Sequence, residues 1–198
     1  AMKLPLFPLN AVLFPGCRLD LQIFEARYLD MISRCMKQGT GFGVVPIGEG
    51  REVGEAPRRL AMVGCEASVR DWQQRPNGLL GIRVEGGRRF QVLSVEVQAD
   101  QLSVGEIEWF EDLPEQPLTY ELNDPAAWLS GLAEHPMVAA LEMGGEPGGQ
   151  QDLANQLAYL LPFDTERKLE LLALPDAQMQ LARIQVLLEH LQGELGID

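Results

Sequence analysis

Serine and lysine are the first residue types here whose spacing could support catalysis, because a lysine held beside a serine can act as its general base. The sequence contains three lysines, Lys3, Lys37 and Lys168. Only Lys37 has a serine at helical spacing, since Ser33 precedes it by four residues. This pair falls on a charged stretch near the expected end of a helix, where a lysine stays solvated. The sequence therefore offers no workable serine–lysine pair.

Phosphate-binding and metal-binding patterns are also missing from the sequence. A phosphate loop needs closely spaced glycines that end in Gly-Lys-Ser or Gly-Lys-Thr, whereas the glycine-rich string 144–149 contains Glu146 and no lysine. The two histidines, His135 and His190, have no second histidine or cysteine at two or four residues' distance. We therefore predict a protein that is not an enzyme and that has no cofactor and no metal site.

The three cysteines, Cys17, Cys35 and Cys65, are widely spaced and form no Cys-x-x-Cys pair. We expect each to be a small buried apolar residue. The apolar run at the N-terminus is broken by prolines and does not resemble a signal peptide. No stretch approaches the roughly 18 apolar residues that a membrane helix needs. These observations predict a cytoplasmic protein without a membrane partner.

One aromatic side chain lies in a polar turn and is a candidate for recognition. Residues 70–76 read Arg-Asp-Trp-Gln-Gln-Arg-Pro. An exposed tryptophan in such a turn is unfavourable unless it binds a partner or folds back onto the protein. We therefore predict Trp72, Arg70 and Arg75 as partner-binding residues, with packing of Trp72 on the edge of the sheet as the alternative.

The charge distribution bears on the type of partner. The net charge is −13, and residues 121–198 carry 13 acidic but only 3 basic side chains. Such a surface repels phosphate backbones, which argues against nucleic acid. A local basic patch is still conceivable, because Arg83, Arg88 and Arg89 lie near a turn and Arg58 and Arg59 form a second group.

Two kinds of element must position these residues. From Leu60 to Phe110 apolar residues recur at every second position, which predicts half-buried antiparallel strands with turns at Asn77-Gly78 and at Gly86-Gly87. The proline-interrupted segments 4–8 and 12–16 favour edge strands or loops over a central strand.

Helical spacing appears before and after this β region. One apolar stripe, followed by a possible stop at Gly39, predicts a single helix that buries Phe24, Tyr28, Met31, Ile32, Cys35 and Met36. After residue 120 the period changes to that of helices, with predicted caps at Asp124 and at Asp164 or Thr165. The sequence thus predicts a β-rich part, 1–120, and a helical bundle, 121–198.

Several ordered strings resemble one known family. Ile23-Phe24-Glu25-Ala26-Arg27-Tyr28 is similar to the most recognisable motif of the N-terminal substrate-recognition domain of Lon-type ATP-dependent proteases. The other matching strings follow in the family's order and cover nearly the whole chain: 4–9, 12–16, 42–45, 63–67, 77–78, 86–90, 153–158, 161–162 and 171–172.

The resemblance implies an α+β fold, in which a PUA-like β pseudo-barrel with one prominent helix precedes a small helical bundle. It also implies a stand-alone recognition domain without ATPase or protease parts, whose partner is a protein or an unfolded polypeptide. RNA binding, which is common among PUA-like barrels, and regulation of a separate protease stay open as alternatives. We expect Phe24, Glu25, Arg27 and Tyr28 to serve folding, with Arg27 paired to a loop carboxylate or carbonyl.

Overall fold

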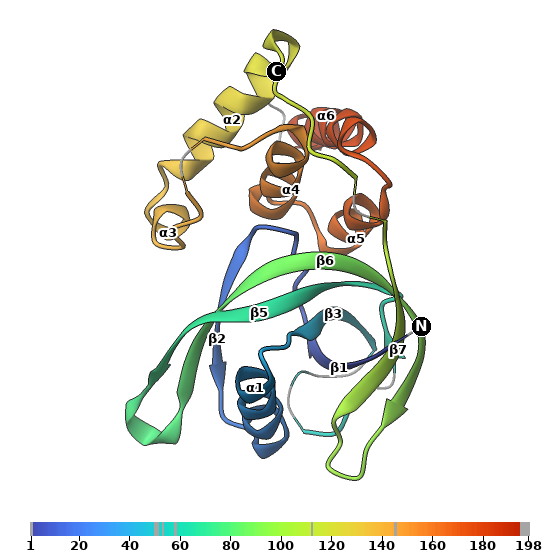
Figure 1. Ribbon diagram of the computed structural model, residues 1–198. Helices are drawn as coiled ribbons and strands as arrows, with labels where there is room; N and C mark the ends of the chain where they lie inside the picture. Colours follow the sequence, from blue (N-terminus) through green and yellow to red (C-terminus); the bar gives the residue numbers. More distant parts are fainter. Residues whose placement is uncertain are drawn as a thin grey trace. The chain divides into compact units, whose positions relative to one another are not determined.

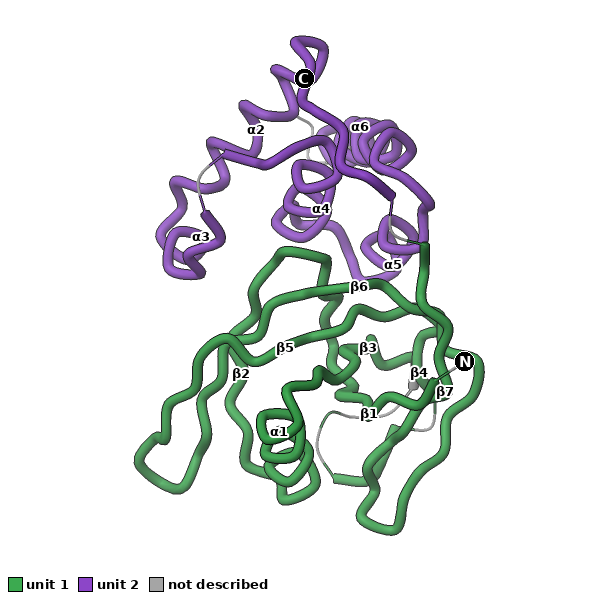
Figure 2. The backbone as a smooth tube through the Cα atoms, viewed as in Figure 1, with its two compact units in different colours: residues 1–112 green, residues 113–198 purple. Residues whose placement is uncertain are grey.

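A computed structural model describes residues 2–49, 52, 54–57, 59–111, 113–144 and 146–194. The chain forms two compact units, residues 1–112 and residues 113–198, which Figure 2 shows in different colours. Each unit has its own buried apolar residues and is described separately below.

The first unit is a closed ring of strands. The ring runs β1–β7–β6–β5–β3 and returns to β1, because β1 also pairs with β3. Its strands are β1 (Met2–Leu9), β3 (Phe42–Glu49), β5 (Val63–Gln74), β6 (Leu80–Val97) and β7 (Ser103–Trp109). Outside the ring, β2 (Arg18–Ile23) pairs with β6, and the short β4 (Arg59–Leu60) pairs with β3. This arrangement is the predicted pseudo-barrel.

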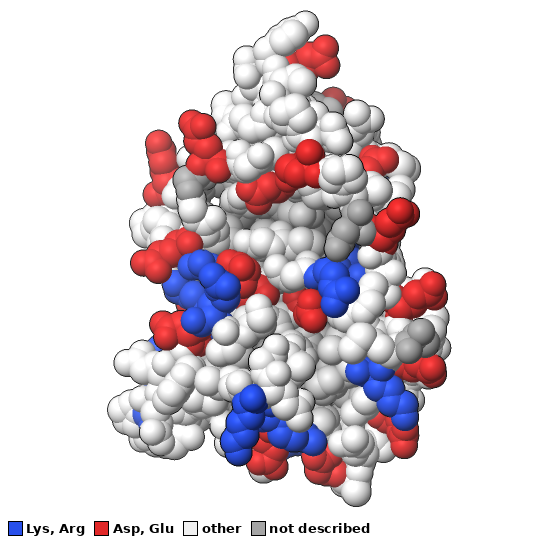
Figure 3. Space-filling view, viewed as in Figure 1, with Lys and Arg blue, Asp and Glu red and all other residues white. Residues whose placement is uncertain are grey.

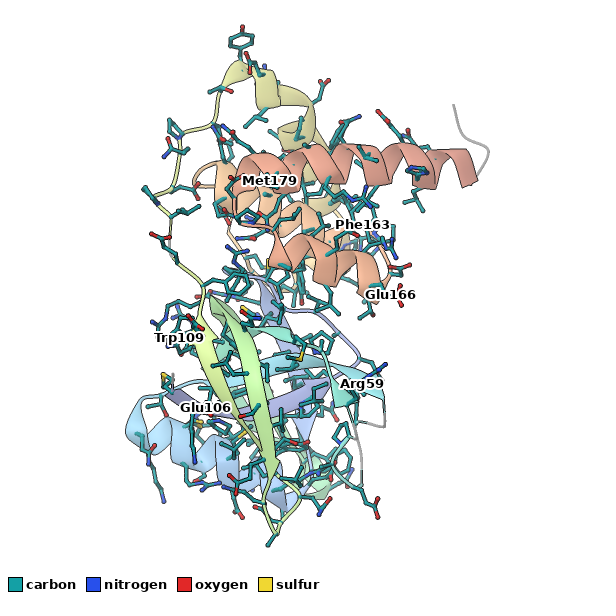
Figure 4. All side chains as sticks on the ribbon, turned by 90° about the vertical axis from the view of Figure 1, so that its right-hand side faces the viewer. Arg59, Glu106, Trp109, Phe163, Glu166 and Met179 are labelled. Atoms are coloured by element: carbon teal, nitrogen blue, oxygen red, sulfur yellow. The ribbon has the colours of Figure 1, made fainter. Side chains whose placement is uncertain are left out.

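The interior of the ring is filled by the inward-facing residues of the alternating strands. Its apolar cluster consists of Leu4, Leu6, Val45, Phe90, Val92 and Ile107. The rings of Phe90 and Trp109 meet edge to face, with centroids 6.0 Å apart. Trp109 lies on β7, where its Nε1 donates to the sulfur of Met2 at 3.2 Å (Figure 4). The period-two pattern between Leu60 and Phe110 therefore identified β5, β6 and β7 correctly.

The first proline-interrupted segment is a strand paired with two neighbours, contrary to our expectation of an edge strand or loop. Residues Met2–Pro5 pair with β7, and Leu6–Leu9 pair with β3. Each neighbour thus pairs with only half of β1. Each of the two prolines, which has no backbone N–H group to donate, therefore lies in only one of the two ladders. The second segment, around Val12–Pro15, is a loop as predicted.

A single helix, α1 (Ala26–Gln38), lies against the strands (Figure 1). Tyr28 stacks on Phe7 of β1 with ring centroids 4.2 Å apart. The helix ends at Gly39, whose φ of 66° and N–H bond to the carbonyl of Cys35 form the predicted C-terminal cap. Phe24 precedes the first helical residue and is 54% exposed, so its predicted place in the buried stripe was wrong.

Met36, the last residue of the predicted stripe, is exposed as well. It lies at the margin of the apolar face, which is centred on Tyr28, Met31, Ile32 and Cys35, all of them buried. Helical spacing alone therefore predicted the position of the apolar face correctly but overestimated its width.

Of the two predicted turns, only the first is a turn. Asn77 and Gly78 both have positive φ, 77° and 75°, and reverse the chain between β5 and β6. Gly86 and Gly87 instead lie within β6, which continues to Val97. The backbone of Gly86 exchanges hydrogen bonds with Gly16 and Cys17, and a Cβ there would lie 2.1 Å from the carbonyl oxygen of Phe14. A glycine is needed at position 86 because a loop approaches the backbone closely there, and not because the chain reverses.

The second unit contains only helices among its described residues. They are α2 (Asn123–Ala133), α3 (Pro136–Ala139), α4 (Gln150–Leu160), α5 (Thr165–Ala173) and α6 (Ala177–Glu194), with a 3-10 turn at Tyr120–Leu122 before α2. Helix α4 contacts α2, α5 and α6, and its residues Leu153–Ala158 are all buried. The predicted connector at 144–149 includes Gly145, which lies outside the described residues.

Side-chain carboxylates accept hydrogen bonds from backbone N–H groups at the beginning of three of these helices. Asp164 accepts from the N–H of Arg167 at 2.8 Å, which confirms the predicted cap of α5. Asp176 accepts from the N–H of Met179, which lies near the beginning of α6 (Figure 4). Glu115 accepts from the N–H groups of Gln151 and Asp152 at the start of α4. The predicted cap at Asp124 was wrong, because α2 already includes Asp124, begins at Asn123 and has no side-chain cap.

Candidate functional site

The predicted partner-binding residues lie on a ribbon of three strands. We define the hairpin ribbon as β2 (18–23), the end of β5 (69–74) and the beginning of β6 (80–85). Strand β6 lies in the middle, because it pairs with β2 on one edge and with β5 on the other. The turn that joins β5 to β6 projects away from the ring of strands (Figure 1). Alternation along the strands gives the ribbon one apolar and one charged face.

The apolar face carries Trp72. Ile82 is the register partner of both Leu21 on β2 and Trp72 on β5, so these three side chains form one row across the ribbon. Ile82 is 3% exposed, whereas Trp72 is 55% exposed. The row thus runs from the half-buried Leu21 through the buried Ile82 to the exposed Trp72. Trp72 is therefore exposed and not part of the buried core.

The charged face is organised around Arg83. Its register partners are Asp20 on β2 and Asp71 on β5. Arg83 donates two hydrogen bonds to Asp20, from Nε at 2.8 Å and from Nη2 at 3.0 Å. The hydrogen bond from Arg83 is the largest cause that lowers the pKa of Asp20, and the positive charge of Arg75 lowers it further. Arg83 is therefore committed to an ion pair within the ribbon.

Trp72 and Arg75 come together, whereas Arg70 lies apart from them. Trp72, Arg75 and the Asp20–Arg83 pair line a shallow cavity of about 210 Å³. Arg70 falls at an irregularity in the pairing between Val69 and Asp71, and its guanidinium lies 4.0 Å from Glu85. Among the described residues no ion pair involves Arg75. The two predicted residues that line the cavity are thus an exposed aromatic residue and a cation without an ion pair among the described residues.

Three arginines of the alternative basic patch, Arg83, Arg88 and Arg89, are engaged within the protein. Arg88 lies over the ring of Trp109 at 3.9 Å and 3.8 Å from Glu66, and Arg89 lies over Phe110 at 4.8 Å. Arg59 is exposed, and Arg58 lies outside the described residues. On the face drawn in Figure 3, basic side chains occur in small groups next to acidic ones. This distribution differs from the continuous basic stripe typical of nucleic-acid surfaces.

The residues first considered for chemistry do not form a catalytic arrangement. Ser33 and Lys37 are both exposed on α1. Cys17, Cys35 and Cys65 are buried free thiols, and burial raises the pKa of the Cys35 and Cys65 thiols. Within the described ranges, no group of three or more His, Cys, Asp or Glu side chains is placed to hold a metal ion. No described helix combines the length and apolar character needed to cross a membrane.

The motif residues at the start of α1 have structural contacts. Arg27 is 5% exposed and donates from Nη1 to the carbonyl oxygen of Gln101 at 2.8 Å, which is the loop carbonyl that we expected. Its Nη2 lies 3.2 Å from Glu25, and its guanidinium lies over the ring of Tyr28. These contacts tie the beginning of the helix to the β6–β7 loop.

Comparison with known proteins identifies the family. Residues 3–190 match the family described as the ATP-dependent protease La (LON) substrate-binding domain. A crystal structure of a Lon N-terminal domain protein from Xanthomonas campestris is 31% identical, with a TM-score of 0.74, and the match covers 94% of this chain and 98% of that one.

The N-terminal domain of a Mycobacterium avium complex Lon protease has the same fold, with a TM-score of 0.59 at 16% identity, over 95% of this chain and 97% of that one. The family match covers most of the sequence, and the Xanthomonas structure is similar in both fold and sequence. The chain therefore belongs to the LON substrate-binding domain family.

Proposed function

We propose that this protein binds polypeptide segments, without catalysis of its own, and that the open end of the hairpin ribbon is a contact surface for them. The observation that carries the proposal is Trp72, which is 55% exposed although its register partner Ile82 is buried. Tryptophan is among the residues that contribute most to protein interfaces when a partner covers it. Membership in a family named for substrate binding supports the same role.

The surroundings of Trp72 suit a polypeptide better than a phosphate backbone. The cavity beside the indole ring is lined by two carboxylates, Asp20 and Asp71, as well as by Arg75 and Arg83. Because Asp20 already neutralises Arg83, Arg75 is the cation lining this cavity for which the described residues form no ion pair. One apolar anchor with one cation fits an unfolded segment that presents an apolar side chain beside a carboxylate or carbonyl group.

The proposal is tested with a permanently unfolded protein. Reduced and carboxymethylated α-lactalbumin, labelled with fluorescein, should bind to the wild-type protein more tightly than native α-lactalbumin does. Trp72→Ala should weaken this binding by about tenfold or more, the loss expected for an aromatic anchor. Arg75→Gln should weaken it less, because a cation at the rim of an interface contributes less than the anchor.

Tyr120→Ala provides the matched control, because Tyr120 is an aromatic residue that is 81% exposed but lies in the second unit. Its affinity should stay within about twofold of wild type. Equal affinity for the native and unfolded test proteins would contradict the proposal, and so would an unchanged affinity of Trp72→Ala. A salt-dependent shift of single-stranded RNA at low salt would instead support the RNA-binding alternative.

We also propose a cytoplasmic location, because all three cysteines are free thiols, which is usual in reducing compartments. Regulation of a separate ATP-dependent protease would use the same binding activity. It predicts that adding the protein changes the rate at which such a protease degrades an unfolded substrate, and that Trp72→Ala abolishes the change.

A further inference from the structure

A second and larger cavity lies within the first unit, away from the hairpin ribbon. It has a volume of about 340 Å³, which is within the range of sites that bind small ligands or side chains. We call it the α1–β1 cleft, because α1 lines it from Met31 to Gln38 and β1 lines it from Met2 to Pro5. Its other walls come from Thr40 and Gly41 and from the β6–β7 loop and β7.

Part of the lining of the α1–β1 cleft is apolar. Met31 and Cys35 line it from the helix, and Leu4, Leu102 and Val104 line it from the strands. Burial raises the pKa of the Cys35 thiol, so this group stays neutral at physiological pH and adds no negative charge. A space of this size and character accommodates one large apolar side chain.

The charged residues that line the α1–β1 cleft in the described part of the chain are both positive. Although the sequence contains 29 acidic residues, none of those that the structure describes lines the cleft, whereas Lys3 and Arg34 both do. Within the described part of the chain, neither cation takes part in an ion pair, and both are exposed. Glu106 is the register partner of Lys3, but its carboxylate accepts a hydrogen bond from Ser94 on the other neighbouring strand. Two uncommitted cations beside an apolar space favour a ligand with an apolar group next to an anion.

The same cleft lies along a free edge of the sheet. In the ring, β1 lies between β7 and β3, and its pairing with β3 begins only at Leu6. No described strand therefore pairs with Met2–Pro5 on the edge that faces β3. A free strand edge presents backbone N–H and C=O groups to which an extended peptide can add.

We infer that the α1–β1 cleft binds the carboxyl-terminal end of an extended polypeptide, with its last apolar side chain in the cleft and its α-carboxylate held by Lys3 and Arg34. The backbone before that residue pairs with the free edge of β1. This inference rests on the proposed function and adds a defined class of ligand to it. A chain end supplies all three features that the cleft matches: an apolar side chain, an adjacent carboxylate and an extended backbone.

The test uses fluorescein-labelled decapeptides with a glycine–serine body that end in leucine, phenylalanine or methionine. Each is made as the free acid and as the carboxyl-terminal amide. The free acids should bind, and the amides should bind at least about tenfold more weakly, as expected when a charge-assisted hydrogen bond is lost. Arg34→Gln and Lys3→Gln should each lower the affinity for the free acids by about tenfold and leave that for the amides unchanged.

Lys37→Gln is the matched control, because it removes one exposed charge from the same helix outside the cleft and should change neither affinity. Circular dichroism of each variant verifies that it is folded. Equal binding of acids and amides would overturn the inference, as would unchanged affinity in Arg34→Gln or the absence of binding by every peptide. Binding of octanoate without binding of any peptide would also overturn it, because the cleft would then take small carboxylates.

These outcomes are separable from those of the proposed function. If Trp72→Ala weakens binding of the unfolded protein while acids and amides bind equally to the wild type, polypeptide recognition stands and the α1–β1 cleft takes no part in it. If the free acids bind through Arg34 but the unfolded protein binds no better than the native one, recognition is restricted to chain ends.

Discussion

Arg27 Nη1 donates a 2.8 Å hydrogen bond to the carbonyl oxygen of Gln101, 74 residues further along the chain. This bond joins the first turn of α1 to the loop between β6 and β7. Gln101 has a φ of 71°, a conformation that side-chain-bearing residues rarely adopt, so the contact is made to a loop of unusual backbone geometry. The motif that first identified the family thus connects two parts of the barrel that are distant in sequence.

Replacement of Arg27 by methionine should strongly destabilise the first unit. The substitution keeps the apolar part of the side chain but leaves Glu25 without its cation and the Gln101 carbonyl without its donor. We expect the free energy of unfolding to fall by about 3 kcal/mol, the usual effect of breaking a buried ion pair. Urea unfolding followed by near-ultraviolet circular dichroism measures this. Lys37→Met, an exposed change on the same helix, should alter stability by less than about 0.5 kcal/mol, and equal losses in both variants would contradict the expectation.

The Asp20–Arg83 pair should give the hairpin ribbon a defined response to acid. Arg83 lowers the pKa of Asp20 below its ordinary value of 3.8. The pair therefore stabilises the folded state fully above that value, and the contribution is lost as the pH falls through the lower pKa of the folded state. Since Asp20 is partly exposed, we expect the contribution to be less than about 1 kcal/mol.

Carboxyl carbon chemical shifts followed by NMR during an acid titration test this directly. In Arg83→Gln the pKa of Asp20 should rise toward its ordinary value, whereas Arg59→Gln, the control at an exposed arginine that does not line the same cavity, should leave it unchanged. An unaltered titration of Asp20 in Arg83→Gln would show that the bidentate contact is not formed in solution.

Glu115 should stabilise the helical unit from outside its helices. Its two carboxylate oxygens accept from the N–H of Gln151 at 2.7 Å and of Asp152 at 3.1 Å, which satisfies donors at the start of α4 that have no partner within the helix. Glu115→Ala should therefore lower the free energy of unfolding of this unit by about 1 kcal/mol, as loss of a cap commonly does. Far-ultraviolet circular dichroism in urea measures the effect, and Glu121→Ala, which removes an exposed carboxylate of the same unit, should have almost none.

Local patterns predicted the elements of the fold better than their connections. The alternation around Cys65 and Ile82 and the positive φ required at Asn77-Gly78 depend on neighbouring residues, so the strands and the turn between them followed from the sequence. Gly86-Gly87 has the composition of a turn but lies inside β6, because the loop around Phe14 approaches the backbone there. A rule based on neighbouring residues cannot predict that contact, since the two segments are about 70 residues apart in the sequence.

The candidate sites also show that local patterns do not predict contacts between segments distant in the sequence. Trp72 and Arg75 are close in sequence, so one turn sufficed to predict them together, and the structure places both at one cavity. Arg70 is as close in sequence, but the irregularity in the β5–β6 pairing turns it toward Glu85. Lys3 and Arg34 carry no shared pattern at all, because they meet only after β1 and α1 pack beside each other. A pair of this kind is visible only in three dimensions.

The cysteines should report on the α1–β1 cleft. All three thiols are buried, and burial raises the pKa of Cys35 and Cys65, so few thiolates are present at pH 8 and alkylation of the folded protein should be slow. Of the three, only Cys35 lines the cleft. We therefore expect Cys35 to react first with iodoacetamide, as identified by peptide mass spectrometry, and all three to react rapidly in urea.

A saturating concentration of a free-acid peptide should then slow the reaction of Cys35, because the last side chain of the peptide would occupy the space through which the reagent enters. The corresponding amide, at the same concentration, should protect Cys35 less. Cys65 supplies the internal control, since it lies outside the cleft lining and its slow reaction should depend on neither peptide. Reaction of Cys65 before Cys35 would mean that the cleft is closed to small molecules in solution, and that the last side chain of a peptide could enter it only after α1 moves.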